Sequence, residues 1–85
     1  MYELYPANRR VERKLDNLIK TRKDIIEKLK RLKEDPRKNV VAHKLHGRLA
    51  GKWSCWLGSN LRIIYIINDS EKKIEIEAVG THKIS

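Results

Sequence analysis

The chain has 85 residues, of which 20 are Lys or Arg and 11 are Asp or Glu, so its formal net charge is +9. This length suits one domain spanning residues 1–85, and so small a core leaves little room for an enclosed cofactor, so we expect none. No apolar run approaches the roughly 18 residues of a membrane span, and the single cysteine excludes an intrachain disulfide, so we expect a cytoplasmic protein with no membrane contact.

The first half of the chain predicts a short strand and a helical layer. Residues 2–5 alternate in polarity, as a strand does. Asn8 can cap a helix whose apolar residues then recur at i, i+4, i+7 and i+8. Thr21 and the acid three residues later have the spacing of a capping box, which would open a second amphipathic helix. Residues 8–35 therefore form either two helices with a tight join or one helix bent near Thr21.

The second half predicts three strands after an irregular stretch at residues 37–51. Apolar residues recur with a period of two over residues 53–57, 61–67 and 74–79, and polar turns separate these runs. We expect an α+β fold in which two N-terminal helices pack on one face of a small, mainly antiparallel four-stranded sheet. The predicted core face of the sheet carries Trp53, Cys55, Leu57, Leu61, Ile63, Tyr65, Ile67, Ile74, Ile76 and Ala78.

The register of the strands predicts what lies on the face that the helices leave uncovered. A three-residue loop from Gly58 to Asn60 keeps buried residues opposite buried residues, and it places Trp56 directly across from Arg62. The same reasoning in the next hairpin puts Arg62 beside Val79, with His82 at the rim of this face. A sheet with one uncovered face offers that face to a partner.

Each polar or aromatic residue on this face has two interpretations. Arg62, alone in an apolar strand, is either a phosphate clamp or a surface arginine stacked on Trp56. Trp56 is either a platform for a nucleic-acid base or an apolar anchor for a protein. Histidine side chains in general can transfer protons near neutral pH, so His82 and His43 are candidates for proton transfer, although most surface histidines have no such role.

The middle of the chain, residues 39–62, favours a polyanionic partner. It contains four bases and no acid. These bases are Lys44, Arg48, Lys52 and Arg62. A metal site built from His43, His46, Cys55 and His82 is the alternative for this region. We expect no metal there, because the two nearest histidines diverge in an extended segment and Cys55 falls on the core face.

Four segments resemble the RelE/YafQ superfamily of toxins from type II toxin–antitoxin systems. They are His43-x-Leu45-x-Gly47, Gly51-x-Trp53-Ser54-Cys55, Leu61-Arg62-Ile63-Ile64-Tyr65 and Val79-Gly80-Thr81-His82. The resemblance covers nearly the whole chain, is specific in the second half, and implies a RelE-like fold. It also implies an endoribonuclease, or mRNA interferase, that cuts messenger RNA in the ribosomal A site without a metal.

The resemblance also implies roles for individual residues and a partner. Arg62 would stabilise the phosphate, while His82 and His43 would transfer protons. We expect RNA contacts from Trp56, Lys44, Arg48, Lys52 and Asn60. Trp56 and Asn60 replace a histidine and an aspartate of YafQ-like members, and neither side chain can act as a base. The implied partner is an acidic, helical RelB-like antitoxin that covers the basic surface and docks on the helical layer, rather than a second copy of the chain.

Two alternative functions follow from these departures and from the charge. One is a catalytically weakened homologue that binds the ribosome, RNA or an antitoxin without cutting. The other is a standalone basic nucleic-acid-binding domain, which predicts steeply salt-dependent binding to naked nucleic acid.

Overall fold

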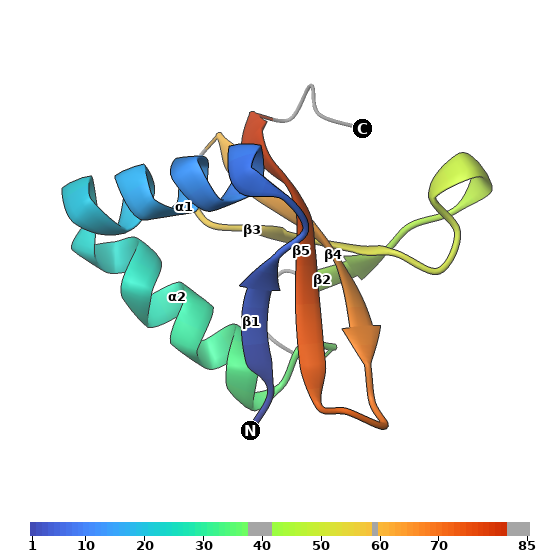
Figure 1. The fold of residues 1–85 in the computed structure, drawn as a ribbon. Helices are drawn as coiled ribbons and strands as arrows, with labels where there is room; N and C mark the ends of the chain where they lie inside the picture. The colour runs from blue at the N-terminus through green and yellow to red at the C-terminus, as the bar shows by residue number, and fades with distance from the viewer. Residues whose placement is uncertain (38–41, 59, 82–85) are drawn as a thin grey trace.

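Two helices lie on one side of a five-stranded sheet in the computed structural model, which describes residues 1–37, 42–58 and 60–81 (Figure 1). The elements are β1 (Glu3–Pro6), α1 (Arg9–Thr21), α2 (Lys23–Glu34), β2 (Ala42–Lys44), the 3-10 helix η1 (Gly47–Leu49), β3 (Trp53–Trp56), β4 (Leu61–Asn68) and β5 (Lys73–Thr81). The strand order is β1-β5-β4-β3-β2, with β1 parallel to β5 and the other pairs antiparallel. None of the helices in these described ranges is long and apolar enough to cross a membrane.

The predicted α+β class is confirmed, but the sheet has five strands instead of four. The additional strand is β2, which lies in the stretch that we expected to be irregular. It pairs with β3 through three residues only, from Ala42 opposite Cys55 to Lys44 opposite Trp53. Three residues are too few to show the alternation of polarity that identifies a strand in a sequence. The position of β2 is set instead by its pairing with the edge of β3.

The helical layer consists of two helices separated by a one-residue break. Asn8 caps α1 as predicted, since its side chain accepts a hydrogen bond from the Val11 amide at 3.0 Å. The predicted capping box is wrong: the Thr21 hydroxyl donates to the Asn17 carbonyl at 2.8 Å, so it bonds backward into α1. The residue before α2 is Arg22, whose extended backbone makes the break and which provides no side-chain cap.

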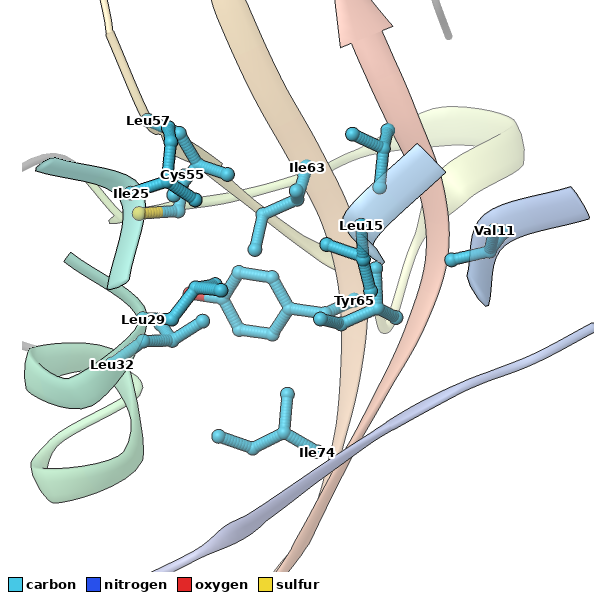
Figure 2. Packing of buried hydrophobic residues seen from close by; sticks show 12 residues of the cluster. Val11, Leu15, Ile25, Leu29, Leu32, Cys55, Leu57, Ile63, Tyr65 and Ile74 are labelled. Carbon is cyan, nitrogen blue, oxygen red and sulfur yellow. The ribbon is translucent and has the colours of Figure 1, made fainter. Parts of the chain in front are cut away.

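The core lies between the helices and the sheet, and Tyr65 is at its centre (Figure 2). Tyr65 is fully buried, and its hydroxyl donates to the Pro36 carbonyl at 2.7 Å, which fixes the end of the helical layer to the middle of β4. The buried cluster comprises Val11, Leu15, Ile25, Leu29, Leu32, Cys55, Leu57, Ile63, Tyr65, Ile74, Ile76 and Val79.

The register between β3 and β4 agrees with the prediction, with Trp56 opposite Arg62. Between β4 and β5 a bulge intervenes, because Tyr65 pairs with Ile76 but Ile64 pairs with Ala78, leaving one extra residue in β5.

The bulge corrects the predicted faces at the end of β5. Arg62 lies opposite Gly80 and not beside Val79. Val79 is 3% exposed and belongs to the core, so the predicted core position of Ala78 is wrong and the two residues exchange faces.

Candidate active site

The face of the sheet away from the helices, here called the open face, carries the candidate site. Cross-strand pairing places Ser54, Ile64 and Ala78 in one row across the three central strands. The adjacent row consists of Trp56, Arg62 and Gly80. Ser54 is 2% exposed and Ile64 is 4% exposed, so they form a closed floor beside the larger side chains of the second row.

Arg62 and Trp56 form the central pair of this site. The Arg62 Cζ atom lies 5.8 Å from the centroid of the Trp56 ring, and both residues are partly buried. Such a cation–π contact is worth about 0.5–1 kcal/mol at an exposed position, and it holds the guanidinium in a fixed direction. On its other side Arg62 faces Gly80, which has no side chain.

His43 is on the same face, at the edge strand β2. It is exposed and pairs with Ser54, so its side chain is on the same face of the sheet as Trp56, two residues further along β3. Diagonal neighbours of this kind on adjacent strands are about 7–8 Å apart. Arg62 is one strand further, and strand spacing puts its backbone about 12 Å from that of His43. Both side chains are long enough to approach one phosphate group placed between them.

The other predicted site residues are only partly brought together. Asn60 is exposed just before β4, and His82 lies outside the described residues. Lys52 reaches across the open face to form an ion pair with Glu77 at 2.5 Å. Lys44 pairs with Trp53 and so belongs to the opposite face. The exposed Arg48 is in η1, within a loop that extends away from the sheet (Figure 1).

Two bases that the sequence reasoning did not select lie at the border of the site. β1 pairs with β5 only as far as Ile76, and beyond that residue the first turns of α1 lie beside β5. Lys14 donates a 3.4 Å hydrogen bond to the Val79 carbonyl, next to the residue opposite Arg62. With Arg10 it lines a hollow of about 270 Å³ along this edge. The i, i+4 spacing of Arg10 and Lys14 was the available signal.

Cys55 takes no part in this site. Burial raises the pKa of its thiol to about 11, so the thiol stays protonated at neutral pH and is a poor nucleophile. Its place in the core also separates it from His43 on the open face. Within the described ranges, no group of three or more His, Cys, Asp or Glu residues is arranged to hold a metal ion.

Comparison with known proteins gives the fold its name. No family model matches the sequence, and no curated protein matches it either. Among solved structures, the RelE toxin of E. coli superposes with a TM-score of 0.74 at 24% identity, covering 100% of this chain and 88% of that one. The YoeB–YefM toxin–antitoxin complex from Staphylococcus aureus gives a TM-score of 0.74 at 16% identity, covering 96% of this chain and 98% of the matched chain.

A third structure agrees with these two. The YoeB/ParE toxin from Agrobacterium tumefaciens gives a TM-score of 0.73 at 20% identity, covering 94% of this chain and 98% of that chain. All three superpositions extend over nearly the whole chain, although the sequences have diverged widely. The chain therefore has the fold of the RelE and YoeB toxins, as its resemblance to the RelE/YafQ superfamily implied.

Proposed function

We propose that this chain is an endoribonuclease toxin of a type II toxin–antitoxin system, which cuts messenger RNA in the ribosomal A site without a metal. The observation that carries the proposal is the Arg62–Trp56 pair on the open face of a RelE-type fold. An arginine held against an indole offers a phosphate a planar hydrogen-bonding cation, and the indole offers a neighbouring base a stacking surface.

The proposed reaction uses only groups of the RNA and of the protein. The 2′-hydroxyl attacks the adjacent phosphorus while a base removes its proton. The bond from phosphorus to the 5′-oxygen then breaks, and an acid returns a proton to that oxygen. The products are a 2′,3′-cyclic phosphate and a 5′-hydroxyl. Charge accumulates on the pentacovalent phosphate, where a fixed cation lowers the barrier most.

Each role is assigned to the residue whose chemistry fits it. Arg62 stabilises the pentacovalent phosphate, and Trp56 stacks against a base next to the cleaved bond. His43 and His82 are the proposed proton-transfer groups, since neither the indole of Trp56 nor the amide of Asn60 transfers protons near neutral pH. Lys52 contributes less charge than a free lysine, because Glu77 neutralises it in part.

The proposed partner is an acidic antitoxin, which acts with the toxin in the cytoplasm. YoeB of Staphylococcus aureus forms a heterotetrameric complex with YefM, and a Mycobacterium tuberculosis relative of the same fold is also in a toxin–antitoxin complex. A chain with a net charge of +9 attracts an acidic protein by long-range electrostatics, which supports the same kind of partner here.

Induced expression of the chain without an antitoxin tests the proposal. We expect growth arrest and cleavage inside codons of translated messages. Arg62→Ala should reduce cleavage by about 10²–10³-fold, the usual effect of removing a donor that stabilises transition-state charge. His82→Ala should also reduce it. Arg31→Ala, an exposed arginine of α2, is the matched control and should leave arrest unchanged.

Two results would contradict the proposal in different ways. Growth arrest that persists in a folded double variant, Arg62→Ala with His82→Ala, would show that these two residues do not carry out the cleavage. Association with the ribosome without any cleavage product would instead support the weakened homologue that acts by binding alone.

A further inference from the structure

An ion pair crosses the open face beside the candidate active site, and the proposed reaction does not use it. The Lys52 ammonium lies 2.5 Å from a carboxylate oxygen of Glu77. Lys52 immediately precedes β3 and Glu77 belongs to β5, so the two side chains meet over β4, which lies between those strands. Two strand spacings, about 10 Å, separate the two backbones, and both side chains extend to close this distance.

The bulge in β5 sets the position of the Glu77 carboxylate. The pairing of β4 with β5 shifts at this point and leaves Glu77 as the extra residue, with no residue of β4 opposite it. Bulges re-aim a side chain in this way and are frequent beside active sites. Ala78, the next residue, lies in the row of side chains adjacent to that of Arg62. The ion pair is therefore close to the proposed phosphate clamp.

The ion pair is partly shielded from solvent. The side chain of Lys52 is 32% exposed and that of Glu77 is 26% exposed. Both lie next to the closed floor of Ser54 and Ile64. Salt and water screen a partly buried pair of charges less than an exposed pair, so the carboxylate holds the ammonium more firmly than it would at an open surface. Lys52 is consequently a cation that already has a ligand.

Other bases lie near the same carboxylate. Glu77 lines the hollow of about 270 Å³ that Arg10 and Lys14 also line. With Lys52 these residues place three positive charges around one carboxylate. Such a position favours any anionic oxygen, including that of an RNA phosphate. The carboxylate thus occupies a place that also suits the polyanion proposed as the substrate.

We propose that Glu77 is an internal competitor of RNA, whose carboxylate an RNA phosphate must displace before it reaches Lys52. The inference rests on the proposed function for RNA as the ligand, and it adds a residue that lowers the affinity for this ligand. The consequence is selectivity. A strand that binds Arg62 and Trp56 holds a neighbouring phosphate at high local concentration beside the ion pair, whereas a polyanion that misses them meets a neutralised lysine.

Glu77→Gln tests the inference with the full chain and a short 2′-O-methylated RNA, whose blocked hydroxyl cannot attack. The amide keeps the shape of the side chain but removes the charge that holds Lys52. Fluorescence anisotropy should show RNA binding tightened roughly threefold to fivefold, which corresponds to the upper part of the range measured for exposed ion pairs.

Glu75→Gln is the matched control. Glu75 lies opposite Ile66 on the same face of β5, and it forms no ion pair with another residue in the part of the chain that the structure describes. The substitution removes the same charge from the same strand. It should tighten RNA binding by no more than about twofold, because a charge without a direct contact acts only through the screened field.

The gain in affinity must depend on Lys52. In a Lys52→Met background, Glu77→Gln should tighten RNA binding no more than Glu75→Gln does, because no ammonium is left to release. Glu77→Asp is a second variant that keeps the charge but is one methylene shorter. It weakens the bridge over β4 and should tighten binding about twofold, with Glu75→Asp as its control. Urea unfolding shows whether each variant is folded.

Three outcomes would overturn the inference. Neither Glu77 variant, each folded, binds RNA more tightly than its control at Glu75; the gain from Glu77→Gln persists without Lys52; or Glu77→Gln weakens binding, which would make the ion pair a structural support of the site. These outcomes do not depend on cleavage, so they leave the proposed nuclease standing.

The proposed function can fail separately. A chain that shows the predicted differences in RNA binding but cuts no message would lose the nuclease and retain the competition between Glu77 and RNA. If neither the original chain nor any variant bound RNA, the inference and the proposed function would both be wrong.

Discussion

Asp69, in the turn between β4 and β5, joins three distant parts of the chain. It accepts hydrogen bonds from the Tyr2 hydroxyl at 2.6 Å and from two nitrogens of the Arg37 guanidinium at 2.9 and 2.7 Å. Tyr2 precedes β1 and Arg37 follows α2, so one carboxylate connects both ends of the helical half to the sheet. These bonds, those of Arg37 first, lower the pKa of Asp69 from 3.8 to about 2.

The lowered pKa predicts how stability depends on pH. Because the pKa of this carboxyl is lower in the folded state, its contribution is fully present above the unfolded value of about 3.9 and is lost as the pH falls through about 2. Asp69→Asn should therefore lower the free energy of unfolding at pH 7, and the difference from the original chain should shrink between about pH 4 and pH 2.

Urea unfolding of both proteins at several pH values measures this difference. Asp16→Asn is the control, since this exposed carboxylate forms no ion pair with another residue that the structure describes. A difference between Asp69→Asn and the original chain that stays constant down to the lowest pH would show that the charge of Asp69 does not stabilise the fold.

At the level of single residues, the sequence predicts contacts that a strand pattern dictates and misses the others. The Arg62–Trp56 pair follows from loop length and alternation alone, because a one-residue slip would expose buried side chains. The partners of Asp69 leave no such pattern, since a polar residue in a turn gives no direction to its side chain. Lys14 was missed for the same reason: its contact with Val79 depends on where α1 lies against β5.

Among the elements, β5 departs most from its predicted arrangement. Ala78 and Val79 are adjacent and both apolar, so alternation does not say which of them faces the helices. The bulge decides this by adding a residue to β5, and it thereby places Gly80 beside Arg62. The residue of β5 that lies opposite Arg62 thus depends on a local irregularity of the backbone that the sequence pattern does not encode. The missed strand β2 is a similar case, because three residues carry too little pattern.

Two substitutions that each add one hydroxyl test the bulged register. Val79→Thr keeps the shape of the side chain but places a hydroxyl in the core, and it should cost about 1–3 kcal/mol of stability. Ala78→Ser introduces a hydroxyl on the open face instead, and it should stay within about 0.5 kcal/mol of the original chain. Chemical denaturation measures both. If Ala78→Ser destabilised the protein more than Val79→Thr, the result would contradict the bulge and indicate the regular register, with Ala78 in the core.

In the molecule as a whole, the two surfaces proposed for binding are on opposite sides of the sheet. The open face carries Arg62 and Trp56, whereas the helical layer, where the antitoxin is expected to dock, covers the other face. Core residues of β4 and β5 separate them, so occupation of one does not block the other sterically. An antitoxin that docks on the helical layer alone would leave the open face accessible. Neutralisation then requires a further segment of the antitoxin to reach Arg62.

The net charge of +9 makes salt dependence the measurement that separates the roles of Arg62 and Trp56. For single strands, log K falls against log salt with a slope of about −0.7 per phosphate contacted. With a 2′-O-methylated RNA, which has no hydroxyl to attack, Arg62→Ala should make the slope shallower by about 0.7. Trp56→Ala should weaken binding by about 1–3 kcal/mol at every salt concentration and leave the slope unchanged, because stacking releases no counterion.

Arg31→Ala, on the helical side, controls for the loss of one positive charge and should change the slope far less than Arg62→Ala does. Equal effects of the two arginine variants would mean that RNA senses only the overall charge, as it would with a standalone basic domain. A slope that changes with Trp56→Ala would mean that the indole acts by positioning the guanidinium of Arg62, 5.8 Å away, rather than by stacking on a base. The two slopes together therefore decide whether the open face contacts RNA through one phosphate clamp and one stacking platform.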